Sequence, residues 1–249
     1  IRRGEKVSKN KFFHNICIVS IVSFGFRSRA EVKIGIFGGT FNPIHYGHLR
    51  GAEEVRERFG LTKIIFIPSN NPPLKTQEII DPEHRYKMTE LALSGNSFFE
   101  ISDIEYRKPG KSYTVSTLEE LRSLYTDTSL YFILGIETFL DIPNWWQPEK
   151  LVRLIDFIII SRPPFRFVDL LLSPYSDMSK ENLERLDKAE LESYSAELKT
   201  NREAIAIRTP LIEISGTEIR RLVREGKSIK YLLPEPVESY IISNKLYMR

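Results

Sequence analysis

Two histidines that follow a glycine-rich turn are the residues of this sequence best suited to chemistry. In the stretch GIFGGTFNPIHYGHLR, Gly38, Gly39 and Thr40 precede His45 and His48. Glycine has no Cβ, so this backbone can approach a bulky anionic ligand closely. A helix that begins beside the histidines would add unpaired N–H groups and a partial positive charge, which favour a phosphate. The stretch therefore predicts a nucleotide site in which imidazoles donate to phosphate oxygens.

A second candidate phosphate-binding segment lies far along the chain, in the sequence ISGTEIR at 214–220. Ser215 and Thr217 stand where a predicted strand gives way to a helix, so each can cap the helix or bind a phosphate oxygen. Arg220 falls one turn after Thr217 on the same face, and its fork of donors can reach a triphosphate. We expect the fold to bring this segment to the histidine pair.

The elements that must position these residues follow an alternating pattern. Short apolar runs alternate with segments of helical period, which is typical of parallel strands joined by crossover helices. Strands are predicted at 33–37, 63–67, 98–101, 104–106, 130–134, 157–160 and 204–208. Helices are predicted at 46–59, 82–93, 114–124, 216–225 and 236–244. The predicted fold is a Rossmann-like α/β fold, a doubly wound parallel sheet with flanking helices and a small C-terminal helical part.

The composition favours one main folded domain without a nucleic-acid partner. The 249 residues, 41% of them hydrophobic, can bury one sizeable core. Net charge is +3, but residues 1–30 carry seven basic residues and one acidic residue, which leaves −3 for the rest. A mildly acidic body offers no broad basic surface to nucleic acid. Cys17 is the only cysteine, which fits a reducing compartment, and no apolar run is long enough to span a bilayer.

The histidine motif resembles the signature of the nucleotidylyltransferases that carry a (T/H)xGH motif after a GGTFDPxHxGH-like turn. The match runs from Gly38 to His48, with Asn42 where an aspartate is usual. So many fixed residue types in one short run are far more specific than a lone glycine motif. The segment 214–220 resembles the ISxTxIR motif of the same family.

Within that superfamily, the sequence is similar to the nicotinate-mononucleotide adenylyltransferases over residues 33–246. The similar stretches are PPLK at 72–75 with His84-Arg85, KSYTVSTL at 111–118, GIETFLDIPNW at 135–145 and SRP at 161–163. Glu137 and Ser116 depart from the family pattern, which has an aspartate at both places. These departures concern the binding of the acceptor and leave the phosphate motifs intact.

The resemblance implies adenylyl transfer from ATP to nicotinate mononucleotide, which gives deamido-NAD and pyrophosphate in NAD biosynthesis. It assigns catalysis to His45, His48 and Arg220. Phosphate binding then falls on Gly38, Gly39, Thr40, Phe41, Lys75, Ser215 and Thr217, and mononucleotide binding on Tyr113, Thr114, Glu137, Trp145 and Arg162. The attacking 5′-phosphate is already an anion, so catalysis consists of positioning and charge compensation. A neighbouring phosphate should raise the pKa of an imidazole and favour its charged donor form.

The acceptor residues make physical sense without the family. Trp145 can stack on an electron-poor pyridinium, with Trp146 as the adjacent candidate, although a tryptophan here could equally be a core residue. Tyr113 and Thr114 open a predicted helix, so their N–H groups can bind a pyridine carboxylate or serve an ordinary cap. Such donors would favour nicotinate over nicotinamide, because an amide adds donors to a site made of donors.

Lys75 and Arg85 are weaker candidates for phosphate binding. Lys75 could close its loop over the phosphates, whereas Arg85 could equally pin its helix to a neighbour. The sequence offers no dedicated carboxylate cage, so Mg²⁺ would be shared mainly with ATP. The use of ATP implies a cytoplasmic location, with neither nucleic acid nor membrane as a partner. Homo-oligomerisation is left open.

Two other functions fit parts of the same pattern. Phosphopantetheine adenylyltransferases share both phosphate motifs, but they are shorter and lack the SYT and GxDxLxxLPxW patterns. A non-catalytic nucleotide-sensing module could bind ATP or NAD precursors, yet it would need neither the imidazole pair nor the triphosphate grip.

We divide the chain into an N-terminal extension, 1–30, and a nucleotidylyltransferase domain, 31–249. The extension is predicted to be weakly ordered or vector-derived. Residues 164–203 look like a surface insertion that two prolines open. Its charged stretch at 179–199 carries leucines at helical spacing and predicts an amphipathic helix.

Overall fold

The computed structural model describes residues 32–73 and 79–248. The expectations for residues 1–30 and for Lys75 lie outside the described residues. Seven strands form one sheet in the order β3-β2-β1-β4-β5-β7-β6. They are β1 Val32–Gly39, β2 Lys63–Pro68, β3 Phe99–Ile101, β4 Thr128–Gly135, β5 Asp156–Ile160, β6 Ser193–Glu197 and β7 Glu203–Ile207. All neighbours pair in parallel except β6 and β7, which are antiparallel.

The chain winds outward from β1 in one direction and from β4 in the other, as a doubly wound sheet requires. β1 and β4 are neighbours, with Ile34 opposite Leu130 and Ile36 opposite Phe132. A ligand of such a sheet binds at the carboxyl ends of the strands, where the direction of winding reverses. The predicted fold class is confirmed.

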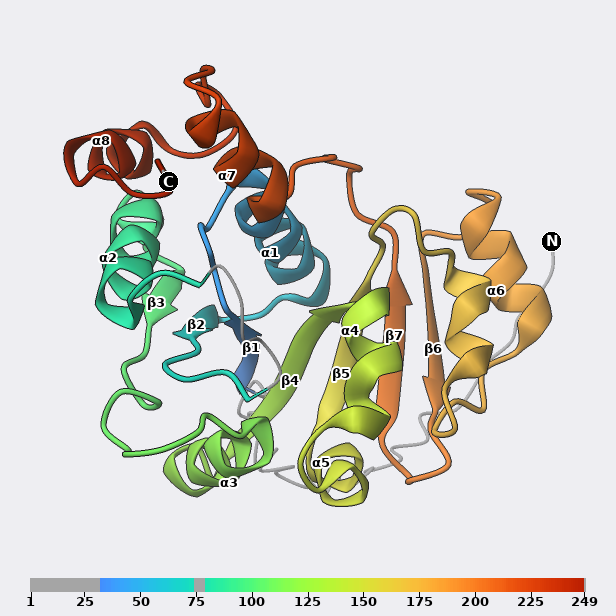
Figure 1. Ribbon diagram of the computed structural model, residues 1–249. Coiled ribbons are helices and arrows are strands. Elements are labelled where there is room, and N and C mark those ends of the chain that lie inside the picture. Colours follow the sequence, from blue (N-terminus) through green and yellow to red (C-terminus); the bar gives the residue numbers. More distant parts are fainter. Residues whose placement is uncertain (1–31, 74–78, 249) are drawn as a thin grey trace, which may run out of the picture. The chain divides into compact units, whose positions relative to one another are not determined.

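Two apolar cores cover the two faces of the sheet, each sealed by its own helices (Figure 1). One core takes side chains from α3 Thr114–Leu124, α4 Ile136–Asp141, α5 Pro148–Leu154 and α6 Lys180–Asp187, with the 3₁₀ turns η1 Ile142–Asn144 and η2 Phe167–Leu172. The other takes them from α1 Tyr46–Phe59, α2 Pro82–Leu93, α7 Gly216–Arg224 and α8 Glu235–Ser243. The central strands are buried on both faces, which is why they read as continuous apolar runs.

Several helix ends follow the local signals in the sequence. Gly60 ends α1 in the left-handed conformation, with φ 60°, as glycine at this position allows. The Asp81 carboxylate accepts from the Glu83 N–H at 2.8 Å, which caps α2 ahead of Pro82. Gly226, with φ 65°, follows α7.

Within the segment 164–203, the amphipathic helix predicted over 179–199 is shorter than expected. α6 covers only Lys180–Asp187, and the chain then forms β6, the antiparallel edge strand. Exposed and half-buried residues alternate along β6, which is a strand period and not a helical one. The predicted strand at 104–106 is also wrong, because β3 ends at Ile101 and a turn follows.

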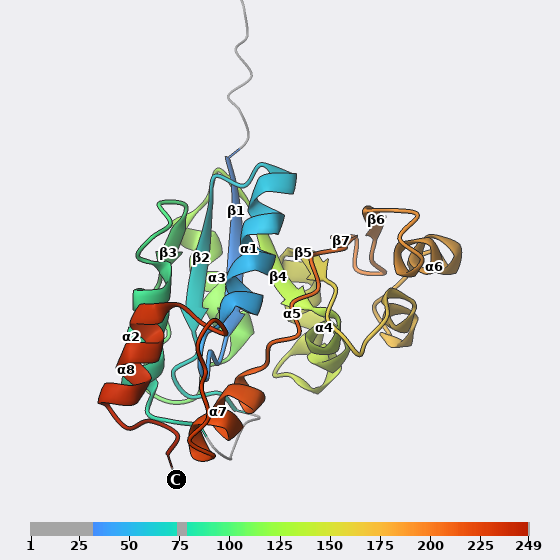
Figure 2. The same ribbon diagram turned by 90° about the horizontal axis from the view of Figure 1, so that it is seen from above.

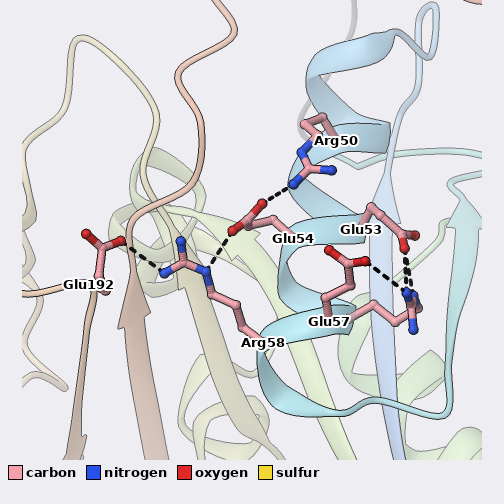
Figure 3. Close-up of polar contacts among 7 residues, drawn as sticks. Arg50, Glu53, Glu54, Glu57, Arg58 and Glu192 are labelled. Atoms are coloured by element: carbon pink, nitrogen blue, oxygen red, sulfur yellow. Dashed lines mark hydrogen bonds and ion pairs between the residues drawn. The ribbon is translucent and has the colours of Figure 1, made fainter.

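Helix α1, which carries the histidine pair at its start, lies along β1 in Figure 2. Figure 3 shows ion pairs among the surface side chains of α1: Glu54 bridges Arg50 and Arg58, and Arg58 pairs with Glu192 at 3.1 Å. Glu192 also accepts from Arg208, the residue after β7, at 3.2 Å. The network joins α1 to the strand end that leads into the second phosphate segment.

Candidate active site

One cavity of about 1210 Å³ contains the predicted site residues that the structure describes. It opens at the carboxyl ends of β1 and β4, the point where the winding of the sheet reverses. Its lining includes Gly38, Gly39, Thr40, Phe41, His45, His48, Tyr113, Thr114, Glu137, Trp145, Arg162, Ser215, Thr217 and Arg220. The two motifs, which are far apart in the sequence, therefore share one cavity.

Gly39 of the phosphate turn also makes room for a buried aromatic side chain. A Cβ on Gly39 would lie 2.8 Å from the ring of Phe41, so Gly39 makes room for this buried side chain. Phe41 itself has φ 46°, in the left-handed region. Its ring meets the His48 ring edge-on, with centroids 5.3 Å apart. The Phe41 ring thus packs against the His48 imidazole. Because this side chain is buried, Phe41 could contact a phosphate only through its backbone.

The two imidazoles lie against each other at the start of α1. Their ring centroids are 3.7 Å apart at an angle of 29°. The backbone N–H of His45 donates to His48 Nδ1 at 3.3 Å. Nδ1 is then an acceptor, so a neutral His48 carries its proton on Nε2. That tautomer equips His48 to donate a hydrogen bond from the far side of its ring.

His45 is the more enclosed imidazole of the pair. Its side chain is 3% exposed and lines the cavity, and neither ring nitrogen has a hydrogen-bond partner among the described residues. Burial, helped by the positive charge of Arg162, lowers the pKa of His45 to about 3. The imidazole is therefore neutral at pH 7. A phosphate would have to outweigh both effects to produce the charged form expected from the sequence.

This low pKa predicts a pH-dependent stability. Between pH 6.5 and 3 the unfolded chain binds a proton on His45 that the folded chain does not, so stability falls as the pH is lowered. At pH values well below 6.5, this effect lowers the free energy of unfolding by about 1.4 kcal/mol for each pH unit. Urea unfolding at pH 7, 6 and 5 measures it, with His45→Gln as the comparison. Parallel stability profiles of the two proteins would contradict the assignment.

The second motif meets the first at Asn42. Arg220 donates from Nη1 to the Asn42 carbonyl oxygen at 2.8 Å and from Nη2 to Thr217 Oγ1 at 3.3 Å. Ser215 Oγ accepts from the Glu218 N–H at 3.1 Å, so it caps α7. A Cβ on Gly216 would lie 2.8 Å from the Asn42 carbonyl oxygen. Glycine at 216 is therefore what lets the start of α7 touch the phosphate turn.

The residues predicted to bind the mononucleotide also line this cavity. Tyr113 occupies the N-cap position of α3, which begins at Thr114 as predicted. Trp145 is partly buried against the core, and its Nε1 donates to Asp141 at 3.0 Å. Trp146 is 56% exposed and packs on Tyr113, with ring centroids 5.4 Å apart. Both tryptophans line the cavity, so the choice of Trp145 over Trp146 remains a prediction.

Some cavity residues escaped the sequence analysis. Glu105 accepts from Thr117 Oγ1 at 3.0 Å, and burial raises the pKa of its carboxyl group. Asp141 also accepts from Asn144, which fixes the turn around Trp145. The segment 209–212, ahead of the second motif, forms another part of the wall. No local signal marks these residues, because their positions depend on distant elements.

Arg85 lies outside the cavity lining and pins its helix, which was one of its two predicted roles. Its guanidinium is almost fully buried and donates to the carbonyl groups of Thr40, Ser69, Asn70 and Ile80. One side chain thus joins the phosphate turn to the end of β2 and the start of α2. Burial lowers the pKa of Arg85, but an arginine stays charged at pH 7.

We expect Arg85→Met to destabilise the protein by about 3 kcal/mol, because it leaves several buried carbonyl groups without donors. Urea unfolding followed by circular dichroism measures this. The control is Arg107→Met, which removes an exposed ion pair to Asp103 and should change stability by less than about 0.5 kcal/mol. Equal effects of the two variants would contradict the role of Arg85.

Among residues 32–73 and 79–248, no cluster of three histidine, cysteine or acidic side chains could hold a metal ion. The acidic residues of the cavity, Glu105, Glu137 and Asp141, do not form such a group. In the same part of the chain, every helix is too short or too polar to cross a bilayer.

Comparisons with known proteins show which proteins this chain is similar to. The model of the cytidylyltransferase-like family matches residues 36–222. A protein of Desulfitobacterium hafniense (strain Y51), named probable nicotinate-nucleotide adenylyltransferase, is 44% identical over 219 residues, 86% of this chain and 95% of the relative. A protein of the same name from Thermoanaerobacter sp. (strain X514) is 39% identical over 221 residues, 88% of this chain and 96% of the relative.

The fold is also similar to that of a solved structure. The Plasmodium falciparum nicotinic acid mononucleotide adenylyltransferase complexed with NaAD superposes with a TM-score of 0.67. The match covers 87% of this chain and 98% of that chain at 23% sequence identity. At this identity the likeness shows a shared fold.

Proposed function

This chain belongs to the cytidylyltransferase-like family, among its nicotinate-nucleotide adenylyltransferases, and we propose how its cavity carries out that reaction. The enzyme transfers the adenylyl group of ATP to nicotinate mononucleotide, which yields nicotinate adenine dinucleotide and pyrophosphate. The observation that carries the proposal is the meeting of the histidine pair and Arg220 in one cavity.

The 5′-phosphate of the mononucleotide attacks the α-phosphorus of ATP in line. The bond between the α-phosphorus and the α,β-bridging oxygen breaks, and pyrophosphate leaves with the electron pair. His48 donates from Nε2 to an oxygen of the reacting phosphates, where negative charge develops. The Gly38–Thr40 backbone holds the α-phosphate, and Arg220 and Thr217 hold the β,γ end. These groups accelerate the reaction by position and charge, because the nucleophile is already ionised.

His45 has a different task from His48 in this proposal. Its buried ring is neutral, and both of its nitrogens lack a protein partner among the described residues. A neutral imidazole can still donate one hydrogen bond to a phosphate oxygen. The neighbouring positive charge of Arg162 compensates the negative charge of the phosphate. His45 and Arg162 together can therefore bind a phosphate while His45 stays neutral.

The acceptor binds between the N-terminus of α3 and the tryptophan pair. The N–H groups at Tyr113 and Thr114 receive the pyridine carboxylate, and Trp145 stacks on the ring. Glu137 and Arg162 contact the remainder of the mononucleotide. Donors at the carboxylate position favour nicotinate over nicotinamide mononucleotide.

The expected metal ion and the expected cellular location are both inferred from the use of ATP as a substrate. Mg²⁺ would be held mainly by the triphosphate, because the described residues offer no cluster of acidic side chains, and it would offset negative charge on the phosphates. A cytoplasmic location is proposed because ATP is available there. The absence of a nucleic-acid partner remains a prediction.

Turnover with different acceptors tests the function. The purified protein is incubated with ATP, Mg²⁺ and nicotinate mononucleotide, nicotinamide mononucleotide or phosphopantetheine, and pyrophosphate release and the dinucleotide are quantified. We expect the highest kcat/KM with nicotinate mononucleotide. Preference for phosphopantetheine would support the rival transferase, and tight ATP binding without any product would support a nucleotide-sensing module.

A further inference from the structure

The residue Tyr247, which follows α8, reaches the phosphate turn from the opposite end of the described chain. Its side chain is 8% exposed, and its hydroxyl donates to Asn42 Oδ1 at 2.9 Å. Burial raises the pKa of the Tyr247 phenol, so the hydroxyl keeps its proton and remains a donor at any ordinary pH. Tyr247 also has φ 63°, a conformation that a tyrosine adopts only where its surroundings hold it.

The helix before Tyr247 is itself anchored. Tyr240 of α8 pairs through its hydroxyl with His84 Nδ1 of α2 at 2.9 Å, and the two rings meet edge-on. The Leu246 N–H donates to the Ile241 carbonyl oxygen at 3.0 Å, which turns the chain back after α8. In Figure 1, α8 lies beside α2. The Tyr247 hydroxyl is therefore presented to Asn42 from a fixed platform.

Asn42 is the point at which three segments meet. Its side chain accepts from Tyr247, its carbonyl oxygen accepts from Arg220 at 2.8 Å, and Gly216 packs against the same carbonyl group. Asn42 also lines the cavity, three residues before His45. A rotation of Asn42 would move both the anchor of Arg220 and the turn that leads to the histidine pair.

We propose that Tyr247 is a positioning residue for adenylyl transfer: its hydroxyl fixes Asn42, and through Asn42 it sets where Arg220 meets the triphosphate. The inference rests on the proposed function, because it deepens the account of the same site. It also gives a physical role to Asn42, at the position where the sequence analysis found a departure from the usual aspartate. The amide oxygen of Asn42 accepts a hydrogen bond from the Tyr247 hydroxyl as a carboxylate would, without placing a negative charge beside the phosphates.

A double-mutant cycle tests the proposal. Wild type, Tyr247→Phe, Asn42→Ala and the double variant are assayed for kcat and for the KM of ATP and of nicotinate mononucleotide. Loss of a hydrogen bond to a buried polar group corresponds to about a 5- to 30-fold effect. We expect Tyr247→Phe to lower kcat/KM for ATP by this factor, with the KM for the mononucleotide unchanged. In the Asn42→Ala background the same change should have no further effect.

The matched control is Tyr231→Phe, which removes a hydroxyl from an exposed tyrosine shortly before α8 that does not line the cavity. Its kcat/KM for ATP should stay within twofold of wild type. Thermal unfolding of all variants separates a positioning effect from a loss of stability. Tyr247→Phe keeps the aromatic ring and its packing, so its unfolding temperature should change little. If Tyr247→Phe fails to fold, Asn42→Ala alone must show the same loss toward ATP.

Several results would overturn the proposal. These are multiplicative losses in the double variant, unchanged ATP kinetics in Tyr247→Phe, or an equal loss in Tyr231→Phe. If the wild type forms no dinucleotide, the proposed function fails, and calorimetry with a non-hydrolysable ATP analogue then applies the same cycle to binding. Coupling between Tyr247 and Asn42 in that titration supports the positioning role, and independent effects refute it.

Discussion

Replacing His48 with alanine lowers kcat by about 10²-fold or more while the fold stays intact. The loss is comparable to that of one oxyanion-hole donor, because the imidazole donates where charge develops on the reacting phosphates. The hydrogen bond from His45 N–H to His48 Nδ1 already directs the other nitrogen of the ring away from the backbone. Initial rates of dinucleotide formation at saturating substrates measure the effect.

The control for His48 is Lys87→Ala, which removes an exposed side chain of α2 that does not line the cavity. Its kcat should remain within about twofold of wild type, with circular dichroism verifying the fold of both variants. Activity of His48→Ala within a few fold of wild type would rule out the proposed role.

Replacing Arg220 with methionine lowers kcat/KM for ATP by about 10²- to 10³-fold. The variant loses the charge that compensates the β,γ-phosphates. It also loses the donor to the Asn42 carbonyl oxygen, which links the two phosphate motifs. Steady-state kinetics with varied ATP measure the loss, and the KM for the mononucleotide should change little.

Arg221 provides a matched control for this experiment. It is the next residue of α7, but its guanidinium pairs with Glu218 and Glu225 on the surface and does not line the cavity. Arg221→Met should leave kcat/KM within about twofold. Arg220→Lys keeps the charge without the planar fork, so its activity should fall between those of wild type and Arg220→Met. Equal activities of the two methionine variants would refute the triphosphate grip.

The sequence predicted the parallel sheet and the elements whose signals are local. The limits of α1, the cap at Asp81 and the start of α3 depend on residues a few positions apart, and the structure confirms them. β6 was missed because an edge strand is specified by its partner β7, and its sequence gives only a weak alternation. α4 and α5 were missed because they are only six and seven residues long.

Site residues that belong to a contiguous sequence motif were predicted. Residues that reach the site only through long-range contacts were missed. The histidine pair and Arg220 could be named from spacing alone. Their proximity was also expected, but the contacts that join the two motifs were not, because these depend on the carbonyl oxygen of Asn42 and on the absence of a side chain at Gly216. Glu105 and Tyr247 carry no motif, and only their contacts reveal them.

The sequence by itself determined which residue types can handle phosphate and where the strands and helices with strong local signals lie, because these properties arise from side-chain chemistry and from neighbours along the chain. Only the tertiary structure decided how those residues are used. It filled the space at Gly39 with the Phe41 ring and gave Arg85 to backbone carbonyl groups. It also buried His45 beside Arg162, which makes that imidazole neutral. Burial and partner choice are set by atoms that meet only after folding, so no local pattern could specify them.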